Sequence, residues 1–147
     1  PGRRLDIEFR VFDDGLGFRY VFPEDSGLDT LLILDELTRF RFTGDPDAWW
    51  IPGDYDSYEH LYQNTPISGI DSANTPVTIE LHDSLYISLH EANLTDFAGM
   101  TFKRDEKGIA TLKSELVPWP DGIKVKAGYL TNPHGVPYRL LIHQADS

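Results

Sequence analysis

The sequence has no cysteine, so it can form no disulfide, no thiolate metal site and no cysteine nucleophile. Basic residues are also few, because 13 Lys and Arg stand against 24 Asp and Glu and give a formal net charge of −11. Nucleic acids and anionic membrane surfaces select cationic proteins. No apolar run approaches the roughly 20 residues of a transmembrane helix. We therefore expect neither a nucleic acid nor a membrane as a partner.

The chain nevertheless has the composition of a folded protein. Its 147 residues are 40% hydrophobic and 12% aromatic, which is enough apolar surface for one ordinary globular domain. There is no internal repeat and no Ser- or Gly-rich linker. The prediction is a single domain over residues 1–147.

Apolar and polar residues alternate along most of the chain, with the period of a β-strand. In the first such stretch, residues 5–11, Leu5, Ile7, Phe9 and Val11 alternate with charged residues, which predicts one buried face and one wet face. Residues 31–34 form a short apolar run, for which we expect a buried strand. Helical periodicity is nearly absent, and its best candidate is residues 56–63.

Turn residues join several of these stretches into hairpins. The three expected hairpins pair residues 5–11 with 18–22, 77–81 with 85–89, and 100–104 with 109–114. Together with residues 38–42, 123–127 and 137–143 they give about nine short strands, as in a sandwich or barrel. Short hairpin loops join only antiparallel strands. The expected fold class is therefore all-β, an antiparallel β-sandwich with very little helix.

The alternation stops between residues 43 and 76, and the residues there are unusual for a connector. Trp49, Trp50 and Tyr55 lie among carboxylates such as Glu59. Aromatic rings beside carboxylates suit sugars, because a ring stacks on the C–H face of a pyranose while carboxylates accept hydrogen bonds from its hydroxyls. The same rings could instead fill a core or pack against another domain, and the sequence leaves both interpretations open.

No self-contained catalytic site is visible. Residues 54–65 begin like a calcium-binding EF-hand loop but have Glu59 where that loop needs glycine and Thr65 where it needs glutamate. The expected strand pairing places His82 and His90 too far apart to share an ion. No GxSxG, HExxH, P-loop or GxGxxG motif occurs in a suitable context.

The order of five segments resembles the amino-terminal domain of glycoside hydrolase family 97, a family of α-glucosidases and α-galactosidases found mainly in Bacteroidetes. These segments read FRVFDDGLGFRYVFPE, LTRFRFTGDPDAWW, DSYEHLYQNTPIS, TPVTIELHDSLYISLHEANLTDFAGM and VPYRLLIHQADS. The resemblance implies a galactose-mutarotase-like β-super-sandwich, of which residues 1–147 are the carboxy-terminal portion. It also implies that a separate (β/α)₈ barrel, absent here, carries the catalytic carboxylates, so that this chain alone is not expected to be active.

The resemblance further implies calcium as the cofactor of the whole enzyme, with Glu91, in LHEANLTDFAGM, as the calcium-ligating carboxylate of the sandwich. The implied partners are the catalytic barrel of the same parent chain and, through it, an α-linked oligosaccharide. The Trp49–Trp50 region is implied to dock against the barrel or to form a wall of the sugar pocket. The implied location is the periplasm.

Two other functions remain open from the residues alone. The chain could be a free-standing carbohydrate-binding module that uses the aromatic residues around Trp49. It could also be an assembly domain whose exposed sheet edge pairs with a second copy.

Overall fold

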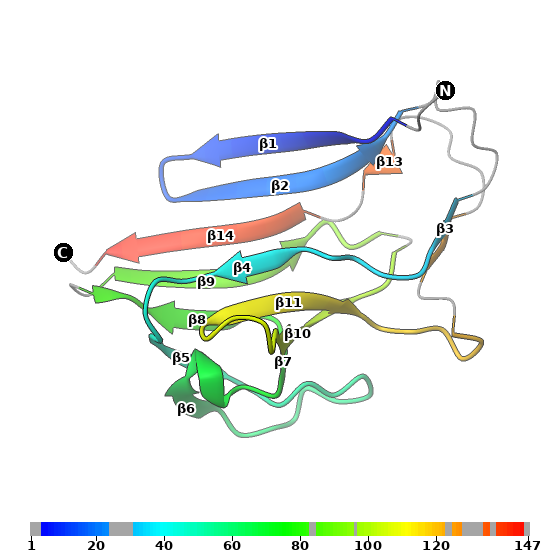
Figure 1. Ribbon diagram of the computed structural model, residues 1–147. Coiled ribbons are helices and arrows are strands. Elements are labelled where there is room, and N and C mark those ends of the chain that lie inside the picture. The colour runs from blue at the N-terminus through cyan, green and yellow to red at the C-terminus, as the bar shows by residue number, and fades with distance from the viewer. Residues whose placement is uncertain are drawn as a thin grey trace.

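The fold is described from a computed structural model, which covers residues 4–23, 31–82, 85–95, 97–122, 125–127, 134–135 and 138–145. Figure 1 shows these residues as two β-sheets packed face to face, with a small strand pair at one end. The strands are β1 (Asp6–Phe12), β2 (Gly15–Phe22), β3 (Leu31–Ile33), β4 (Arg39–Arg41), β5 (Asp47–Trp50), β6 (Gln63–Pro66), β7 (Ser72–Asn74), β8 (Val77–Glu80), β9 (Leu85–Ala92), β10 (Met100–Arg104), β11 (Thr111–Leu116), β12 (Val125–Ala127), β13 (His134–Gly135) and β14 (Tyr138–Ala145).

The large sheet has the strand order β1-β2-β14-β9-β8-β5-β6, with β13 beside β2, and the small sheet has the order β4-β11-β10-β7. Strand β12 pairs with β3 apart from both sheets. Neighbouring strands are antiparallel throughout, and the described residues contain no α-helix and include a short 3₁₀ turn (Ile67–Gly69). The expected all-β antiparallel sandwich is confirmed. In the described part of the chain, no helix is long and apolar enough to cross a bilayer.

The core lies between the two sheets and follows the alternation of the strands. In β8 the side chains of Val77 and Ile79 are fully buried, and Leu89 of β9 joins them from the neighbouring strand. Phe102 of β10 and Leu112 of β11 meet them from the small sheet. Because side chains alternate across a strand, each sheet contributes every second residue to this layer.

The three expected hairpins form, and one of them has shifted ends. Phe9 pairs with Phe18, and Val77 pairs with Leu89, as the alternation predicts. In the third hairpin the second strand runs from Thr111 to Leu116 rather than from 109 to 114. The turn is longer because the Asp105 side chain accepts a hydrogen bond from the backbone N–H of Lys107 and shapes residues 105–110 into a loop.

Two sequence predictions about burial are wrong. The apolar face of β1 is exposed, with 53% of Ile7, 59% of Phe9 and 78% of Val11 accessible. The small sheet ends at β4, so it does not cover β1. In the run at residues 31–34, Leu32 and Leu34 are 55% and 65% exposed, because β3 pairs with β12 among the described strands and lies outside both large layers.

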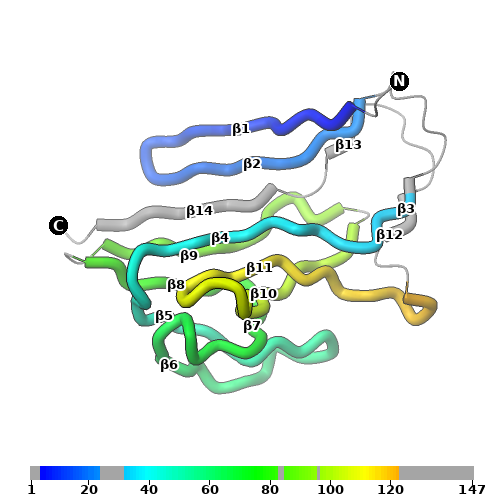
Figure 2. Tube along the Cα trace, in the orientation of Figure 1, coloured from blue at the N-terminus to red at the C-terminus, as the bar shows by residue number. Residues whose placement is uncertain are grey.

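Residues 43–76 are also more regular than the sequence suggests. They contain β5, β6, the 3₁₀ turn and β7, whereas residues 56–63 form no helix. These strands are only three or four residues long, too short for a clear period of two. The tube in Figure 2 shows β5 and β6 at one edge of the large sheet, far from β1.

Candidate functional site

Glu91 lies near the end of β9, on the same strand face as the core residue Leu89. Its side chain is nearly buried, at 9% exposure, and its Oε1 accepts a hydrogen bond from the backbone N–H of Met100 at 3.0 Å. Met100 is the first residue of β10 in the small sheet. The Glu91 carboxylate therefore joins the two sheets at one end of the sandwich.

Gly99 lies beside the Glu91 carboxylate. A side chain added at Gly99 would meet Glu91 Oε1 and Val117 at 3.8 Å and Leu94 at 4.0 Å. An ionised carboxylate in such a place is costly unless hydrogen bonds or a cation compensate it. A carboxylate is a hard oxygen donor, and this one lies where the end of β9 meets the start of β10.

A second nearly buried glutamate, Glu36, lies at the same end and was not singled out from the sequence. Its exposure is 7%, and its Oε1 accepts a hydrogen bond from the Thr38 hydroxyl at 2.7 Å. The Ser114 hydroxyl lies 3.5 Å from Glu36 Oε1 and 3.1 Å from the sulfur of Met100, the residue whose backbone N–H binds Glu91. Glu36 follows an apolar run, and no pattern in the sequence distinguishes it from a solvated carboxylate.

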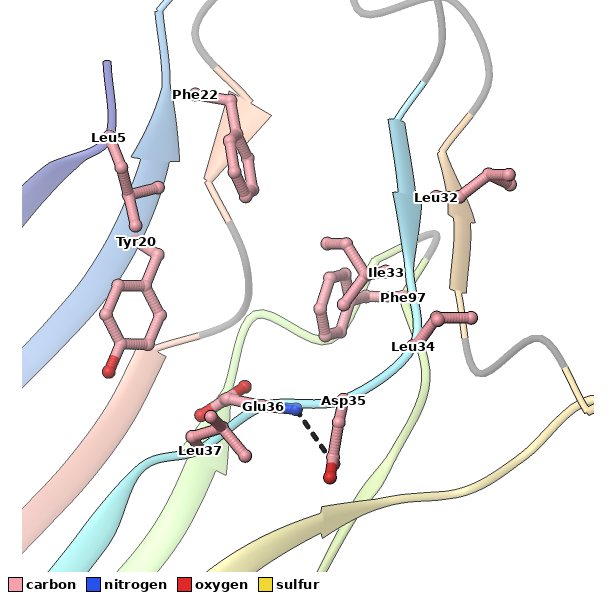
Figure 3. A pocket seen from close by; sticks show the side chains of 10 residues that line it. All are labelled: Leu5, Tyr20, Phe22, Leu32, Ile33, Leu34, Asp35, Glu36, Leu37 and Phe97. Atoms are coloured by element: carbon pink, nitrogen blue, oxygen red, sulfur yellow. Dashed lines mark hydrogen bonds between the residues drawn. The ribbon is translucent and has the colours of Figure 1, made fainter. Parts of the chain in front are cut away.

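An apolar groove of about 590 Å³ opens at this end of the sandwich. Figure 3 shows leucine and aromatic side chains around it, with the carboxylates of Asp35 and Glu36 at one side. Its lining residues are Leu5, Tyr20, Phe22, Leu32, Ile33, Leu34, Asp35, Glu36, Leu37 and Phe97. The groove and the two nearly buried glutamates therefore lie at the same end of the fold.

The described residues do not bring together three or more His, Asp or Glu side chains in a group able to hold a metal ion. Calcium takes about six to eight oxygen ligands. Glu91 by itself therefore fits one position in a calcium site, and the remaining donors would come from another part of the protein or from water.

Trp49 and Trp50 are neighbours on β5, so their rings lie on opposite faces of the large sheet. Trp50 points into the core, is 5% exposed and donates a hydrogen bond from Nε1 to the Thr65 hydroxyl at 3.1 Å. Trp49 lies on the outer face, with its ring centroid 6.1 Å from that of Tyr86. The two tryptophans do not form one stacking surface, and Trp50 has the core-packing role.

Tyr55 and Glu59 lie in the connection between β5 and β6. Partial burial raises the pKa of Tyr55, the charge of Glu115 on β11 raises it further, and a hydrogen bond with Thr101 opposes both effects. Tyr55 therefore lies beside the small sheet, whereas Trp49 lies on the outer face of the large one. Glu59 is exposed, and its backbone N–H donates to the Ser57 hydroxyl at 3.0 Å.

The same connection is shaped by a side-chain hydrogen bond between Asp54 and His60, whose Oδ2 and Nε2 atoms are 3.0 Å apart. The backbone N–H of Asp56 and the His60 side chain lower the pKa of Asp54. These contacts hold the connection in shape but leave its tyrosines exposed, with Tyr58 and Tyr62 at 62% and 66%.

Comparison with known families decides the identity of this fold. The family described as "Glycosyl-hydrolase 97 N-terminal" matches residues 1–146. This chain belongs to that family. The recognition made from the five sequence segments is thereby confirmed.

Solved structures of family 97 enzymes are similar along nearly the whole chain. A glycoside hydrolase family 97 enzyme in complex with acarbose, from Pseudoalteromonas sp. strain K8, is 33% identical with a TM-score of 0.85. A variant of that enzyme in complex with panose gives the same values, and for both the match covers 95% of this chain. A β-arabinopyranosidase, 20% identical with a TM-score of 0.81, matches over 97% of this chain and shares the fold.

The matched region is a small part of each relative. It covers 21% of the Pseudoalteromonas enzyme and 25% of the β-arabinopyranosidase. This family 97 N-terminal domain is therefore similar to one segment of much longer catalytic proteins.

Proposed function

We propose that this chain is a non-catalytic β-sandwich portion of the N-terminal domain of a calcium-dependent α-glycosidase, an α-glucosidase or α-galactosidase. In this proposal Glu91 supplies one ligand to a calcium ion shared with a separate catalytic barrel, and the apolar groove beside Glu36 packs against that barrel. The observation that carries the proposal is the position of Glu91, whose nearly buried carboxylate lies at the same end of the fold as the groove.

The chemistry of Glu91 fits a calcium ion. Calcium prefers hard oxygen ligands such as carboxylates, and the backbone N–H of Met100 orients the Glu91 carboxylate before any ion binds. When bound, calcium would supply positive charge beside the bond to be cleaved. Glu91 would hold the ion's position relative to the sandwich.

The proposed substrate is a terminal α-glycosidic bond. Support comes from a relative, since a family 97 enzyme is described in complex with acarbose and a variant of it in complex with panose. The relatives' greater length supports a catalytic barrel outside residues 1–147. A periplasmic location remains a proposal from the family resemblance alone.

The proposal is tested with the full-length polypeptide that contains residues 1–147. Hydrolysis of p-nitrophenyl α-glucoside and α-galactoside is titrated with calcium after chelation, and calcium binding is measured separately by calorimetry. We expect Glu91→Gln to weaken calcium binding by at least about 10- to 100-fold, the loss typical of removing even an outer-shell partner of a metal ligand. Glu36→Gln, at a similarly buried glutamate of the same end, is the matched control and should leave calcium affinity unchanged.

Two results would overturn the proposal. Unchanged calcium affinity in Glu91→Gln would remove the metal role. Hydrolysis of either substrate by residues 1–147 alone would show that the chain has its own active site.

A further inference from the structure

The outer face of the small sheet concentrates positive charge in an acidic chain. Arg39 of β4, Lys113 of β11 and Lys103 of β10 form a row across the strands, because Arg39 pairs with Lys113 and Lys113 pairs with Lys103. Arg41 lies two residues along β4 and therefore on the same face. Four of the 13 Lys and Arg lie on this one face, although the chain has 24 Asp and Glu.

The side chains of this row point away from the core. Phe102 and Leu112, which precede Lys103 and Lys113 in the sequence, are fully buried between the two sheets. Side chains alternate across a strand, so the two lysines lie on the opposite face. Both lysines are partly exposed, and 46% of the Arg39 side chain is exposed. The row is therefore accessible from outside the sandwich.

The positive charges of the row are only partly compensated. Arg39 forms a salt bridge with Asp105, at the start of the β10–β11 loop. Neither Lys103 nor Lys113 forms a salt bridge with a carboxylate of the described residues. Like charges directly opposite each other on neighbouring strands are destabilising. The two ammonium groups, on strands about 4.8 Å apart, can thus bind an anion that relieves this repulsion.

An aromatic ring lies beside the row. Tyr55, in the connection between β5 and β6, forms a hydrogen bond with Thr101 and lies near the charge of Glu115. Thr101 is two residues before Lys103 on the same strand face, a distance of about 7 Å along β10. The Tyr55 ring is 49% exposed. The face therefore offers an accessible aromatic ring next to two cations.

We propose that the outer face of the small sheet binds a polysaccharide that contains uronic acid. Lys103 and Lys113 bind its carboxylates, and the Tyr55 ring stacks on the C–H face of a neighbouring sugar. This site is separate from Glu91, whose carboxylate lies between the two sheets. The inference therefore does not depend on the proposed function.

A uronic acid polymer fits this face better than a free anion or an acidic protein segment does. Such a polymer carries a carboxylate on each sugar, so it meets a row of cations with a row of anions. The aromatic ring suits the C–H face of a sugar, and neither a free anion nor a row of acidic side chains would use it. The family match is to a glycosyl hydrolase family, whose members act on glycosidic bonds.

The test measures the binding of polygalacturonate to the full-length polypeptide that contains residues 1–147. Calorimetry is carried out with a chelator present, because uronates themselves bind calcium. Binding should weaken as salt is added, since salt screens exposed charges. Lys103→Ala and Lys113→Ala should each weaken it by about 10-fold, as expected for the loss of one hydrogen bond between charged groups. Binding of starch, a neutral polymer, should not change in these variants.

Two further comparisons separate this site from a general effect of charge. Arg10→Ala removes a cation of the large sheet whose side chain is 57% exposed, and it should leave the affinity unchanged. Tyr55→Ala should weaken binding by about 5-fold, whereas Tyr55→Phe keeps the ring and should retain most of the affinity. Thermal unfolding of each variant checks that it is folded.

Three results would overturn the inference. The first is the absence of measurable binding to polygalacturonate. The second is an equal loss of affinity in Arg10→Ala and in the lysine variants. The third is equally tight binding of polyglutamate with no effect of Tyr55→Ala, which would identify an acidic protein segment as the ligand. Failure of the proposed function would appear separately, as a lack of calcium-dependent hydrolysis while polygalacturonate still binds.

Discussion

The backbone N–H of Met100 donates to Oε1 of Glu91 at 3.0 Å, so the first residue of a strand in the small sheet holds a carboxylate of the large sheet. This bond gives Glu91 a structural role in the isolated domain, independent of any metal ion. Structural and metal-binding roles can be separated because a glutamine at this position keeps a neutral oxygen acceptor but loses the charge.

In residues 1–147, Glu91→Ala should lower the free energy of unfolding by about 1–3 kcal/mol, because the Met100 N–H then lacks this acceptor. Glu91→Gln should cost less. Urea denaturation measures both, and Glu59→Ala, at an exposed position, is the control with little effect. Equal stability of Glu91→Ala and the wild type would show that the Met100 bond contributes nothing to folding.

The two tryptophans of β5 should behave differently. Trp50→Ala removes a ring that is 5% exposed and should cost about 3–5 kcal/mol of stability. Trp49→Ala should cost less than about 2 kcal/mol, because the ring packs on Tyr86 at the outer face. Thermal or urea unfolding compares the two. A larger cost for Trp49 would contradict the assigned faces.

The outward position of Trp49 and the exposed tyrosines of the β5–β6 connection keep a carbohydrate-binding module testable as the alternative function. Calorimetry of residues 1–147 with starch oligosaccharides and galactosides should detect no binding if the chain acts only as part of an enzyme. Micromolar binding that Trp49→Ala abolishes would favour the module instead. Trp50→Ala cannot decide this question, because it disturbs the core.

The groove at the Glu91 end gives a prediction about domain packing. Leu34→Asp and Leu37→Asp alter side chains that are 65% and 71% exposed, so residues 1–147 should fold with either change. The full-length protein should lose stability or activity if this end packs against the barrel. Ile109→Asp is the control, since Ile109 is 77% exposed in the β10–β11 loop at the opposite end. Equal effects at both ends would contradict the assignment.

Acid should weaken the contact between Arg39 and Asp105, which lies at the end of the small sheet. The hydrogen bond from the Arg39 side chain, and then that from the Lys107 N–H, lowers the pKa of Asp105 below its ordinary value of 3.8. A lowered pKa means that the contact stabilises the fold fully above about pH 4 and that this stability is lost as the pH falls through the lowered value.

Urea unfolding at pH 7 and below pH 3 tests this direction. Asp105→Asn should be less stable than the wild type at pH 7, and the difference should shrink as the pH falls. A difference that stays constant with pH would show that the charge of Asp105 does not contribute.

The pairing of the hairpins could be predicted because it depends on local information. Alternation over several residues and the turn-forming pair Asp13-Asp14 predict the register of β1 and β2. The observed register, in which Phe9 lies opposite Phe18, agrees with that prediction. The segment with Trp49 was different, since its strands are too short to show a period. Resemblance to a family could direct attention to Glu91, but nothing local marked Glu36, whose carboxylate contacts the nearby Thr38 and, from a distant part of the sequence, Ser114.

The sequence by itself determined the all-β class, the hairpins and the absence of a self-contained catalytic motif, because strand alternation and turn chemistry are properties of neighbouring residues. The tertiary structure alone decided which apolar faces are covered. Phe102 and Phe9 belong to equally apolar strand faces, yet one is fully buried and the other is 59% exposed. The difference arises because burial depends on whether another sheet lies opposite, and the small sheet ends at β4.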